Sequence, residues 1–409
     1  MIMRRILIFS LAYFPKHVGG AEVAIKEITN RISSEEIEFH MVTNRFDSTL
    51  PREEKIGNVM VHRIGITTAD PSMGDLKKWP LNLNKFLFQC GAAWKALSLH
   101  RTYRFDATWA MMAHSCGVPA TIFKLFHPRV PFILTLQEGD PIEYIERKMR
   151  PLWPLFTRAF TKADTIQAIS TFLGRWAHAR GFEGRLEIIP NAVNTEHFSQ
   201  EYPERVIAEV KDTLNKKMGD VFVITTSRLV TKNAVDDMIR ALPLLPHNVS
   251  FVVLGTGPDE VMLKNLAAEL GAHERVKWLG QIGHADMPKY LKACDIFIRA
   301  SRSEGMGNSF VEAMAAGLPV IATQEGGIAD FLFDEKRNPG VPITGWAVDK
   351  DSPEQIAAAV ADIMNRPEKV RAVVATAKEM VIEKYDWNLI AKDMKERVFM
   401  PLLVAETTK

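Results

Sequence analysis

The chain has 409 residues, a hydrophobic fraction of 47%, a charged fraction of 24% and a formal net charge of +2. This length exceeds what one hydrophobic core ordinarily supports and predicts two domains, and the composition is typical of a globular chain, not a disordered one. The nearly neutral charge gives no reason to expect nucleic acid as a partner.

The first apolar run, residues 6–14, follows Arg4 and Arg5. Basic residues before a short apolar run also occur in signal peptides. No small-residue cleavage site follows Phe14, so we interpret the run as a buried β-strand. No run reaches the roughly 18 apolar residues that a membrane-spanning helix needs. The three cysteines are far apart and form no C-x-x-C pair, and we expect a cytoplasmic protein with reduced thiols.

Gly19 and Gly20 follow this run, and residues 21–32 have helical spacing. A strand, a glycine turn and a helix make up the phosphate-binding arrangement of doubly wound folds. The G-x-G-x-x-G spacing of NAD-binding dehydrogenases is absent, which argues against that class of enzyme.

Apolar segments that resemble strands alternate with helical stretches along both halves of the chain. This alternation predicts parallel sheets, with the same architecture used twice. The change between the halves is expected at residues 195–215, where Pro, Glu and Lys accumulate. The strands expected after residues 6–14 are 38–43, 59–64, 106–110, 132–136, 165–170, 221–226, 249–254, 276–279, 296–298 and 320–322.

The most informative stretch, residues 301–323, has the sequence SRSEGMGNSFVEAMAAGLPVIAT. A loop containing Glu304 precedes a helical pattern that begins near Asn308 or Ser309, where one of the two side chains is expected to cap the helix. The free N–H groups of a helix start favour an anion. Glu312 lies in the early helix, so the two carboxylates would approach one molecule from different sides. We expect a negatively charged ligand rich in hydroxyl groups.

This stretch closely resembles the signature of retaining glycosyltransferases of the GT-B fold, glycosyltransferase family 4. The signature is EG-x-G-x-x-x-x-EA-M-A-x-G-x-P-V, and every fixed position from Glu304 to Val320 matches it. The resemblance extends over nearly the whole chain and is more specific in the second half.

The resemblance implies an α/β fold with two Rossmann-like, doubly wound parallel-sheet domains that face a cleft. Residues 1–200 would form the acceptor-side domain, and residues 201–385 would form the nucleotide-sugar-binding domain. A C-terminal helix in residues 386–409 would cross back to pack on the first domain.

The resemblance also implies which residues hold the donor. Arg228 and Lys232 resemble the pair that binds the diphosphate, although Asn233 stands where the usual lysine is found. Glu304 would contact the hydroxyls of the donor sugar, and Glu312 those of the ribose. Arg228, Lys232 and Glu304 are the catalytic residues expected on this basis. The other expected donor contacts are Gly19, Gly20, Gly255, Gly257, Ile282, Gly305, Met306, Gly307, Asn308 and Ser309.

On the acceptor side the resemblance implies Glu22, His114, Gln137 and Asp140. Many relatives have a histidine where Gln137 stands, and glutamine forms hydrogen bonds but cannot act as a base. In the front-face mechanism proposed for the family, the leaving phosphate takes the acceptor proton, so no protein nucleophile is implied. His114 has a second interpretation as an ordinary structural histidine.

These features imply a metal-independent hexosyltransferase that moves a sugar from a nucleotide-activated donor to a glycan or lipid-linked glycan, in surface polysaccharide synthesis. No cofactor or metal is expected, because GT-B enzymes generally use protein cations in place of Mg²⁺. Two alternatives stay open. One is another GT-B-fold nucleotide-sugar enzyme, such as an epimerase or disaccharide synthase. The other is a catalytically degenerate subunit, for which Gln137 and Asn233 are the only support.

Residues 145–162 combine arginines and lysines with Trp153, Phe156 and Phe160. A basic amphipathic surface of this kind can lie on anionic lipid and would place the protein peripherally at the inner membrane face. Two prolines interrupt the segment, and the aromatic residues can equally pack under the sheet. Both interpretations stay open.

Overall fold

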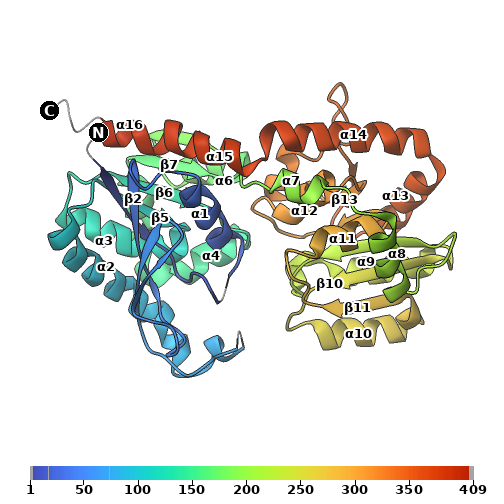
Figure 1. The fold of residues 1–409 in the computed structure, drawn as a ribbon, viewed down its shortest axis with the longest axis horizontal. Helices are drawn as coiled ribbons and strands as arrows, with labels where there is room; N and C mark the ends of the chain where they lie inside the picture. The colour runs from blue at the N-terminus through green and yellow to red at the C-terminus, as the bar shows by residue number, and fades with distance from the viewer. Residues whose placement is uncertain (1–2, 17, 73, 405–409) are drawn as a thin grey trace. The chain divides into compact units, whose positions relative to one another are not determined.

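The computed structural model describes residues 3–16, 18–72 and 74–404. Two compact units make up the chain (Figure 1). Unit 1 consists of the described residues of 1–191 and 387–409, and unit 2 consists of residues 192–386. The functional division of the chain at residue 200 stays a prediction.

An eight-stranded sheet organises unit 1, in the order β3-β4-β2-β1-β5-β6-β7-β8. The neighbouring strands run parallel, with the exception of the antiparallel pair β3–β4. The strands are β1 (Arg4–Phe9), β2 (Ile37–Asn44), β3 (Glu53–Ile56), β4 (Val59–Ile64), β5 (Ala107–Met111), β6 (Phe132–Leu136), β7 (Thr165–Ala168) and β8 (Arg185–Ile188).

Helices cover this sheet, and α2, α3 and α5 pack against one another while α1 packs against α15. The helices before residue 191 are α1 (Gly20–Asn30), α2 (Asn84–Tyr103), α3 (Val118–Phe126), α4 (Ile142–Met149), α5 (Trp153–Thr161) and α6 (Thr171–Ala179).

The first strand is shorter than the apolar run that predicted it. Strand β1 ends at Phe9, where residues 6–9 are fully buried. Just beyond the strand, Asn44 Nδ2 donates a hydrogen bond to the Leu11 carbonyl at 2.9 Å. The sequence analysis also missed β3, whose charged residues gave no strand pattern. It pairs with β4 through a tight turn at Gly57, which has φ of +58°.

The C-terminal segment packs on unit 1, as the resemblance implied. It comprises α15 (Trp387–Asp393), a π-helical segment (Met394–Phe399) and α16 (Met400–Val404). The Phe399 ring is fully buried and lies 5.1 Å from the Trp109 ring on β5 and 5.9 Å from the Phe39 ring on β2. Lys395 also forms an ion pair of 2.6 Å with Glu36.

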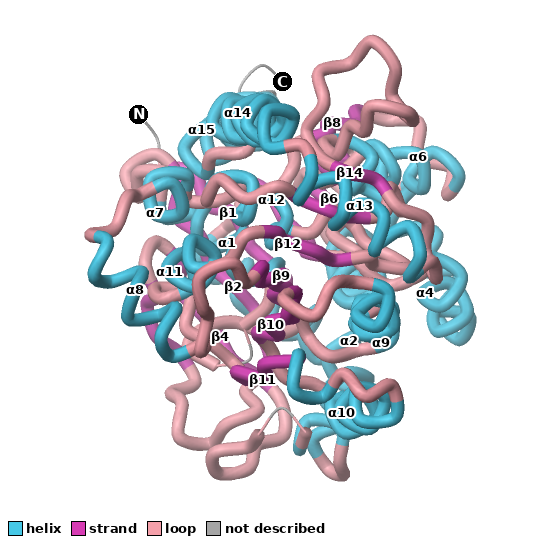
Figure 2. The backbone as a smooth tube through the Cα atoms, turned by 90° about the vertical axis from the view of Figure 1, so that its right-hand side faces the viewer, coloured by secondary structure: helices cyan, strands magenta, loops and turns pink. Residues whose placement is uncertain are grey.

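A six-stranded sheet in the order β11-β10-β9-β12-β13-β14 organises unit 2, and its strand pairs are all parallel. Helices α9, α10 and α13 lie on one side of these strands, and α8 and α11 lie on the other (Figure 2). The strands are β9 (Val221–Thr226), β10 (Val249–Leu254), β11 (Val276–Gly280), β12 (Ile296–Arg299), β13 (Val320–Ala322) and β14 (Trp346–Ala347). The helices are α7 (Thr195–Ser199), α8 (Glu204–Thr213), α9 (Val235–Ala241), α10 (Glu260–Glu269), α11 (Met287–Ala293), α12 (Asn308–Ala315), α13 (Pro353–Asn365) and α14 (Pro367–Lys384).

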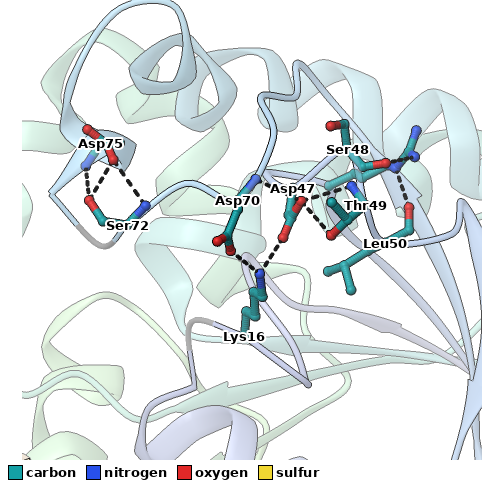
Figure 3. Close-up of polar contacts among 9 residues, drawn as sticks. Lys16, Asp47, Ser48, Thr49, Leu50, Asp70, Ser72 and Asp75 are labelled. Carbon is teal, nitrogen blue, oxygen red and sulfur yellow. Dashed lines mark hydrogen bonds and ion pairs between the residues drawn. The ribbon is translucent and has the colours of Figure 1, made fainter.

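An ion-pair cluster fixes the loop that runs from β1 to α1 (Figure 3). Lys16 contacts Asp47 at 2.6 Å and Asp70 at 2.5 Å. Asp47 is fully buried and also accepts hydrogen bonds from the backbone N–H and hydroxyl of Thr49. The Lys16 ammonium, followed by these hydrogen bonds, holds the pKa of Asp47 far below its usual range. The cluster therefore ties Lys16 to the segments that follow β2 and β4.

Two buried histidines lie side by side on β2 and β4. His40 Nδ1 is 3.1 Å from His62 Nε2, and His62 Nδ1 is 2.9 Å from a Glu53 carboxylate oxygen. Both side chains are 1% exposed, and the Tyr103 ring packs 4.2 Å from the His40 ring. Burial lowers the pKa of His40 to about 4 and also lowers the pKa of His62.

Unit 1 should therefore lose stability as the pH falls from 8 to 5. His40 stays neutral in the folded chain over this range, whereas the unfolded chain takes up a proton near pH 6.5. With a folded pKa of about 4, this one group removes about 2 kcal/mol of unfolding free energy at pH 5. Urea-dependent hydrogen exchange of the β2 peptide at the two pH values measures the loss.

The His40→Gln variant should lack this part of the pH dependence. The matched control is His273→Gln, which changes an exposed histidine of unit 2 and should leave the pH dependence of unit 1 as in the wild type. An equal pH dependence in wild type and His40→Gln would contradict the assignment.

Candidate functional site

The expected donor residues of unit 2 gather at the carboxyl edge of its sheet. Strand β9 has β10 on one side and β12 on the other, so the chain crosses over between these neighbours. Ligands of doubly wound folds bind at this kind of crossover, outside the carboxyl ends of the strands. The loops after β9, β10, β11 and β12 carry the candidate residues between 228 and 312.

Arg228 follows β9 and is exposed. Its guanidinium forms no ion pair with any described residue, so its charge is available to a ligand. The backbone at this point is fixed, because the Asn233 side-chain amide donates to the Arg228 carbonyl at 2.7 Å. Lys232 is half-buried, and its carbonyl accepts a hydrogen bond of 2.7 Å from the Arg302 N–H. The diphosphate role of Arg228 and Lys232 stays a prediction.

Two expected base-side glycines allow neighbouring loops to meet. A Cβ on Gly255, which has φ of +142°, would lie 1.9 Å from the Ser227 carbonyl oxygen. A Cβ on Gly257 would lie 2.1 Å from the Leu229 carbonyl oxygen. Both distances are shorter than any real contact, so only glycine fits, and Ile282 lies half-buried in the next loop.

Arg299, which the sequence analysis missed, is the central side chain of this edge. It is the last residue of β12 and is 9% exposed. Its Nη2 contacts Glu304 Oε2 at 2.5 Å and donates to Asn233 Oδ1 at 2.9 Å, and its Nη1 donates to Ser309 Oγ at 2.9 Å. One guanidinium thus joins the loops after β9 and β12 to the first turn of α12. The charged residue at the end of an otherwise apolar strand was the available signal.

Helix α12 begins at Asn308, as expected, but the predicted side-chain cap is wrong. Its N-cap is Gly307, with φ of +87°, and no described side chain caps the helix. Ser309 is occupied instead as the acceptor of Arg299. Gly305 and Met306 are buried, whereas Asn308 is half-buried.

The two signature glutamates contact partners from different elements. The Glu304 side chain is 11% exposed and pairs with Arg299, while that of Glu312 is 17% exposed and lies 3.6 Å from His284 Nε2. His284 belongs to the loop after β11, and its ring stacks with that of His197 at 5.5 Å. The carboxylates are therefore held by different partners, consistent with contacts to different parts of one ligand.

A second arginine clamps the loops behind this edge. Arg302 forms a bidentate pair with Asp236, with both distances 2.9 Å, and also contacts Asp237 and Asp351. Burial, together with the charge of Asp236, raises the pKa of Asp237 to about 6. The clamp fixes the loop that carries Lys232 against the loop that carries Glu304.

In unit 1, the expected glycine loop leads directly into α1. Gly19 is the N-cap, and its N–H donates to the Glu22 carboxylate at 2.7 Å. Glu22 is 7% exposed, and burial raises its pKa while the Gly19 contact opposes that rise. A Cβ on Gly20 would meet no atom within 4 Å. The Glu22 carboxylate therefore caps its own helix.

The expected acceptor residues of unit 1 lie at the ends of β5 and β6. Glu138, a second residue that the sequence analysis missed, is 2% exposed and accepts from the Ala113 N–H at 2.6 Å and the Gln137 N–H at 2.9 Å. The half-buried His114 has its Nδ1 3.4 Å from the same carboxylate. Asp140 is half-buried in the following loop.

The backbone at this point is strained. Met112 has φ of +70°, a conformation that costs a non-glycine residue energy and that clusters at functional sites. A π-helical turn at residues 113–117 follows, another feature frequent at such sites. Both amide atoms of the Gln137 side chain are buried without a hydrogen-bond partner in the described structure. These features mark the ends of β5 and β6 as the candidate site of unit 1.

Two findings bear on other ligands. Among the residues that the structure describes, no group of three His, Cys, Asp or Glu side chains is placed to hold a metal ion. Within the same residues, no helix has the length and apolar character to cross a membrane.

Both halves of the chain match known families. Residues 18–197 match Glycosyltransferase Family 4, and residues 206–380 match Glycosyl transferases group 1. The chain is similar to a GDP-mannose-dependent alpha-(1-6)-phosphatidylinositol monomannoside mannosyltransferase of Mycobacterium tuberculosis. The two are 28% identical over 244 residues, which cover 57% of this chain and 61% of the relative. The chain thus spans about three fifths of the length of the first curated relatives that it matches.

Two further likenesses cover nearly the full length. An uncharacterised glycosyltransferase of Methanocaldococcus jannaschii is 23% identical over 389 residues, which cover 95% of this chain and 96% of the relative. The solved sucrose-phosphate synthase from Thermosynechococcus elongatus has a TM-score of 0.79 at 19% identity, and the match covers 98% of this chain and 100% of that one.

Anabaena HepE, solved in complex with UDP-glucose, has a TM-score of 0.75 at 20% identity, and the match covers 96% of this chain and 99% of that one. These structural likenesses show the GT-B fold. Because the two family matches also cover the two sheets in turn, the chain belongs to the retaining GT-B glycosyltransferases of family 4.

Proposed function

We propose that this protein transfers a hexosyl group from a nucleotide-activated donor to an acceptor hydroxyl, with retention of anomeric configuration. The observation that carries the proposal is the exposed, unpaired Arg228 at the same sheet edge as Glu304, Glu312 and the start of α12. A cation, two carboxylates and free helix N–H groups suit a molecule that combines a diphosphate with sugar hydroxyls.

The reaction requires stabilisation of the leaving group. The acceptor oxygen bonds to the anomeric carbon while the bond from that carbon to the diphosphate oxygen breaks. Negative charge then develops on the diphosphate, where Arg228 and the N–H groups at the start of α12 lower the barrier. The leaving oxygen takes the acceptor proton, so Gln137 need not act as a base.

The two glutamates hold the two sugars of the donor. A carboxylate accepts from two neighbouring hydroxyls at once, which gives both orientation and affinity. Glu312 is assigned to the ribose and Glu304 to the transferred sugar. Their separate partners, His284 and Arg299, support this division.

The donor is a UDP- or GDP-sugar. The support comes from relatives: HepE was solved with UDP-glucose, and the mycobacterial relative is named as GDP-mannose-dependent. Release of a free disaccharide or of an epimer would favour the alternative GT-B enzymes, and donor binding without turnover would favour a degenerate subunit.

We place a lipid-linked glycan as the acceptor, used at the cytoplasmic membrane face in surface polysaccharide synthesis, because of an apolar face on α2. On α2, Phe86, Leu87 and Trp94 are 76%, 51% and 72% exposed, and just before the helix Trp79 and Leu83 are 79% and 39% exposed. Fully exposed aromatic rings are rare on a protein that stays in water and common where a protein lies on a bilayer.

Positive charge surrounds this α2 face. Lys77, Lys78, Lys85 and, on α4, Lys148 are exposed, and Lys78 pairs with Asp75 at 2.8 Å. The pKa of Lys85 is lowered by partial burial of its ammonium and then by the charges of Lys148 and Lys77, so these groups lie near one another. Apolar rings flanked by ammonium groups suit an anionic bilayer surface.

Of the two interpretations left open for residues 145–162, packing in the core fits the aromatic residues. Phe156 and Phe160 are fully buried in the core, and the Arg180 guanidinium covers the Trp153 ring at 4.1 Å. The exposed residues of 145–162 include basic ones, among them Arg147, Lys148 and Arg158, but none of its three aromatic residues. The proposed membrane contact therefore moves to α2.

The Arg228→Ala variant should lose the binding of a nucleoside diphosphate. One of UDP, GDP, ADP and CMP should raise the melting temperature of the wild type, and the variant should bind the same nucleotide about 30-fold more weakly, because a charged contact worth about 2 kcal/mol is lost. A thermal-shift panel followed by titration calorimetry measures both.

Arg205→Ala, an exposed arginine of α8 with 85% side-chain exposure, is the matched control and should bind like the wild type. If no nucleotide stabilises the wild type, the donor assignment fails. If Arg228→Ala binds normally, Arg228 has no diphosphate role.

Replacing the α2 aromatics should release the protein from anionic vesicles. The variant Phe86→Ser/Trp94→Ser loses two rings, each worth about 1.5 kcal/mol, and should bind vesicles of phosphatidylcholine and phosphatidylglycerol about 100-fold more weakly in co-sedimentation. Val261→Ser/Met262→Ser, which removes exposed apolar side chains from α10, should bind like the wild type. Wild-type protein that leaves the anionic vesicles unbound would refute the membrane proposal.

A further inference from the structure

Position 233 departs from the family pattern at the point where the resemblance implies a diphosphate-binding lysine. Asn233 is 2% exposed and makes two opposite hydrogen bonds: its Nδ2 donates to the Arg228 carbonyl at 2.7 Å, and its Oδ1 accepts from Arg299 at 2.9 Å. A lysine has donors only and could not accept from Arg299. The asparagine is therefore matched to an arginine on the neighbouring strand.

The Asn233 side chain is uncharged, and the Arg299 guanidinium beside it carries a full positive charge. Its guanidinium contacts three segments that carry proposed donor contacts, through Asn233, Glu304 and Ser309. The Phe310 ring lies 5.3 Å below it, and its Nε is buried without a partner in the described structure. A buried charge is costly unless it is paired in good geometry, so the surrounding residues must favour this arginine.

The pair with Glu304 also fixes a carboxylate. Glu304 Oε2 lies 2.5 Å from Arg299, while its Oε1 accepts only a 3.2 Å contact from the Gly305 N–H. A carboxylate restrained at one oxygen presents the other in a defined direction, as a group that orients a sugar must. Gly307 and Gly326 pack closely on this residue, since a Cβ on Gly307 would lie 3.1 Å from Glu304 Cγ and a Cβ on Gly326 would lie 1.9 Å from the Glu304 carbonyl oxygen.

We propose that Arg299 supplies a positive charge to this donor site from the end of β12, next to the position on the loop after β9 where the resemblance implies a lysine. Arg299 is a positioning residue that holds Glu304 toward the donor sugar and acts through it, and Asn233 is the matching partner of Arg299. The inference rests on the proposed function, because it assumes a nucleotide-sugar at this edge.

The inference predicts a distinct pattern of binding. Arg299→Met keeps the volume and removes the charge, so it should weaken binding of the nucleoside diphosphate about tenfold. It should weaken binding of the corresponding nucleotide-sugar more, because Glu304 loses its restraint. Arg299→Lys keeps the charge but not the planar fork, so it should retain diphosphate binding and still lose the extra affinity for the sugar.

The decisive variant places a lysine at position 233, in the loop after β9, where the resemblance implies one. Asn233→Lys in the Arg299→Met background should restore at least part of the lost diphosphate affinity, whereas Asn233→Lys alone places two cations together and should weaken folding. The matched control is Arg275→Met. It removes a half-buried arginine that donates to the carbonyls of Leu242, Leu245, Pro246 and Val249, and it should leave both affinities unchanged.

Titration calorimetry with UDP, GDP and their glucose and mannose conjugates tests this on the full chain, with circular dichroism to confirm folding. Wild-type affinities in Arg299→Met, or a folded double variant with no recovery, would overturn the inference. If Arg299→Met does not fold, Arg299→Lys becomes the test of the inference. In that variant, a ratio of sugar-nucleotide to diphosphate affinity equal to that of the wild type would refute the inference. A wild type that binds no nucleotide would instead refute the proposed function.

Discussion

The parallel pairing of β12 with β9 is the constraint on which the rest of unit 2 depends. Ile296 pairs with Val223 and Phe297 with Ile224, so both strands end at the same edge of the sheet. Residues far apart in the sequence, Arg228 and Arg299 among them, therefore leave the sheet as neighbours. Glycines then bring the flanking loops within contact distance, because a side chain at Gly255 or Gly257 would collide with the backbone of the loop after β9.

Charge is distributed differently at the carboxyl edges of the two sheets. In unit 2, Arg228 is exposed, and Arg299 is buried and paired with Glu304. In unit 1, Glu22 and Glu138 are both buried, and backbone N–H groups hold them. Their negative charges, after burial itself, raise the pKa of the nearby Cys116 thiol. The exposed Arg228 suits a diphosphate, which is the physical basis for proposing that the donor binds to unit 2.

In two aromatic-rich segments of unit 1, the amino-acid composition does not show which aromatic side chains are buried and which are exposed. Residues 145–162 have a basic, aromatic composition, yet their phenylalanines pack in the core. In helix α2, apolar and polar residues are not clearly separated along the sequence, yet the outer face of the helix carries the exposed rings. A helix that covers a sheet buries one face, and which face that is depends on the neighbouring α3, which no local pattern specifies.

The sequence by itself determined the alternation of strands and helices, because burial on both faces of a parallel sheet leaves long apolar runs that stand out locally. The bounds of residues 59–64, 132–136, 221–226, 249–254 and 320–322 follow from those runs alone. It also determined the family, since the string from Glu304 to Val320 is contiguous. The end of β1 escaped it because the apolar run continues past Phe9, and β3 escaped it because its charged residues form no apolar run.

Only the tertiary structure decided which side chains meet at the site. Asn233 looked like the loss of a cation when it was considered within its own loop. The pairing of β9 with β12 places it against Arg299, and that contact depends on a neighbour distant in the sequence. The same holds for Glu138, whose partners are the backbone groups of another strand's end. Sequence patterns specify the elements, whereas partners across strands exist only once the sheet has formed.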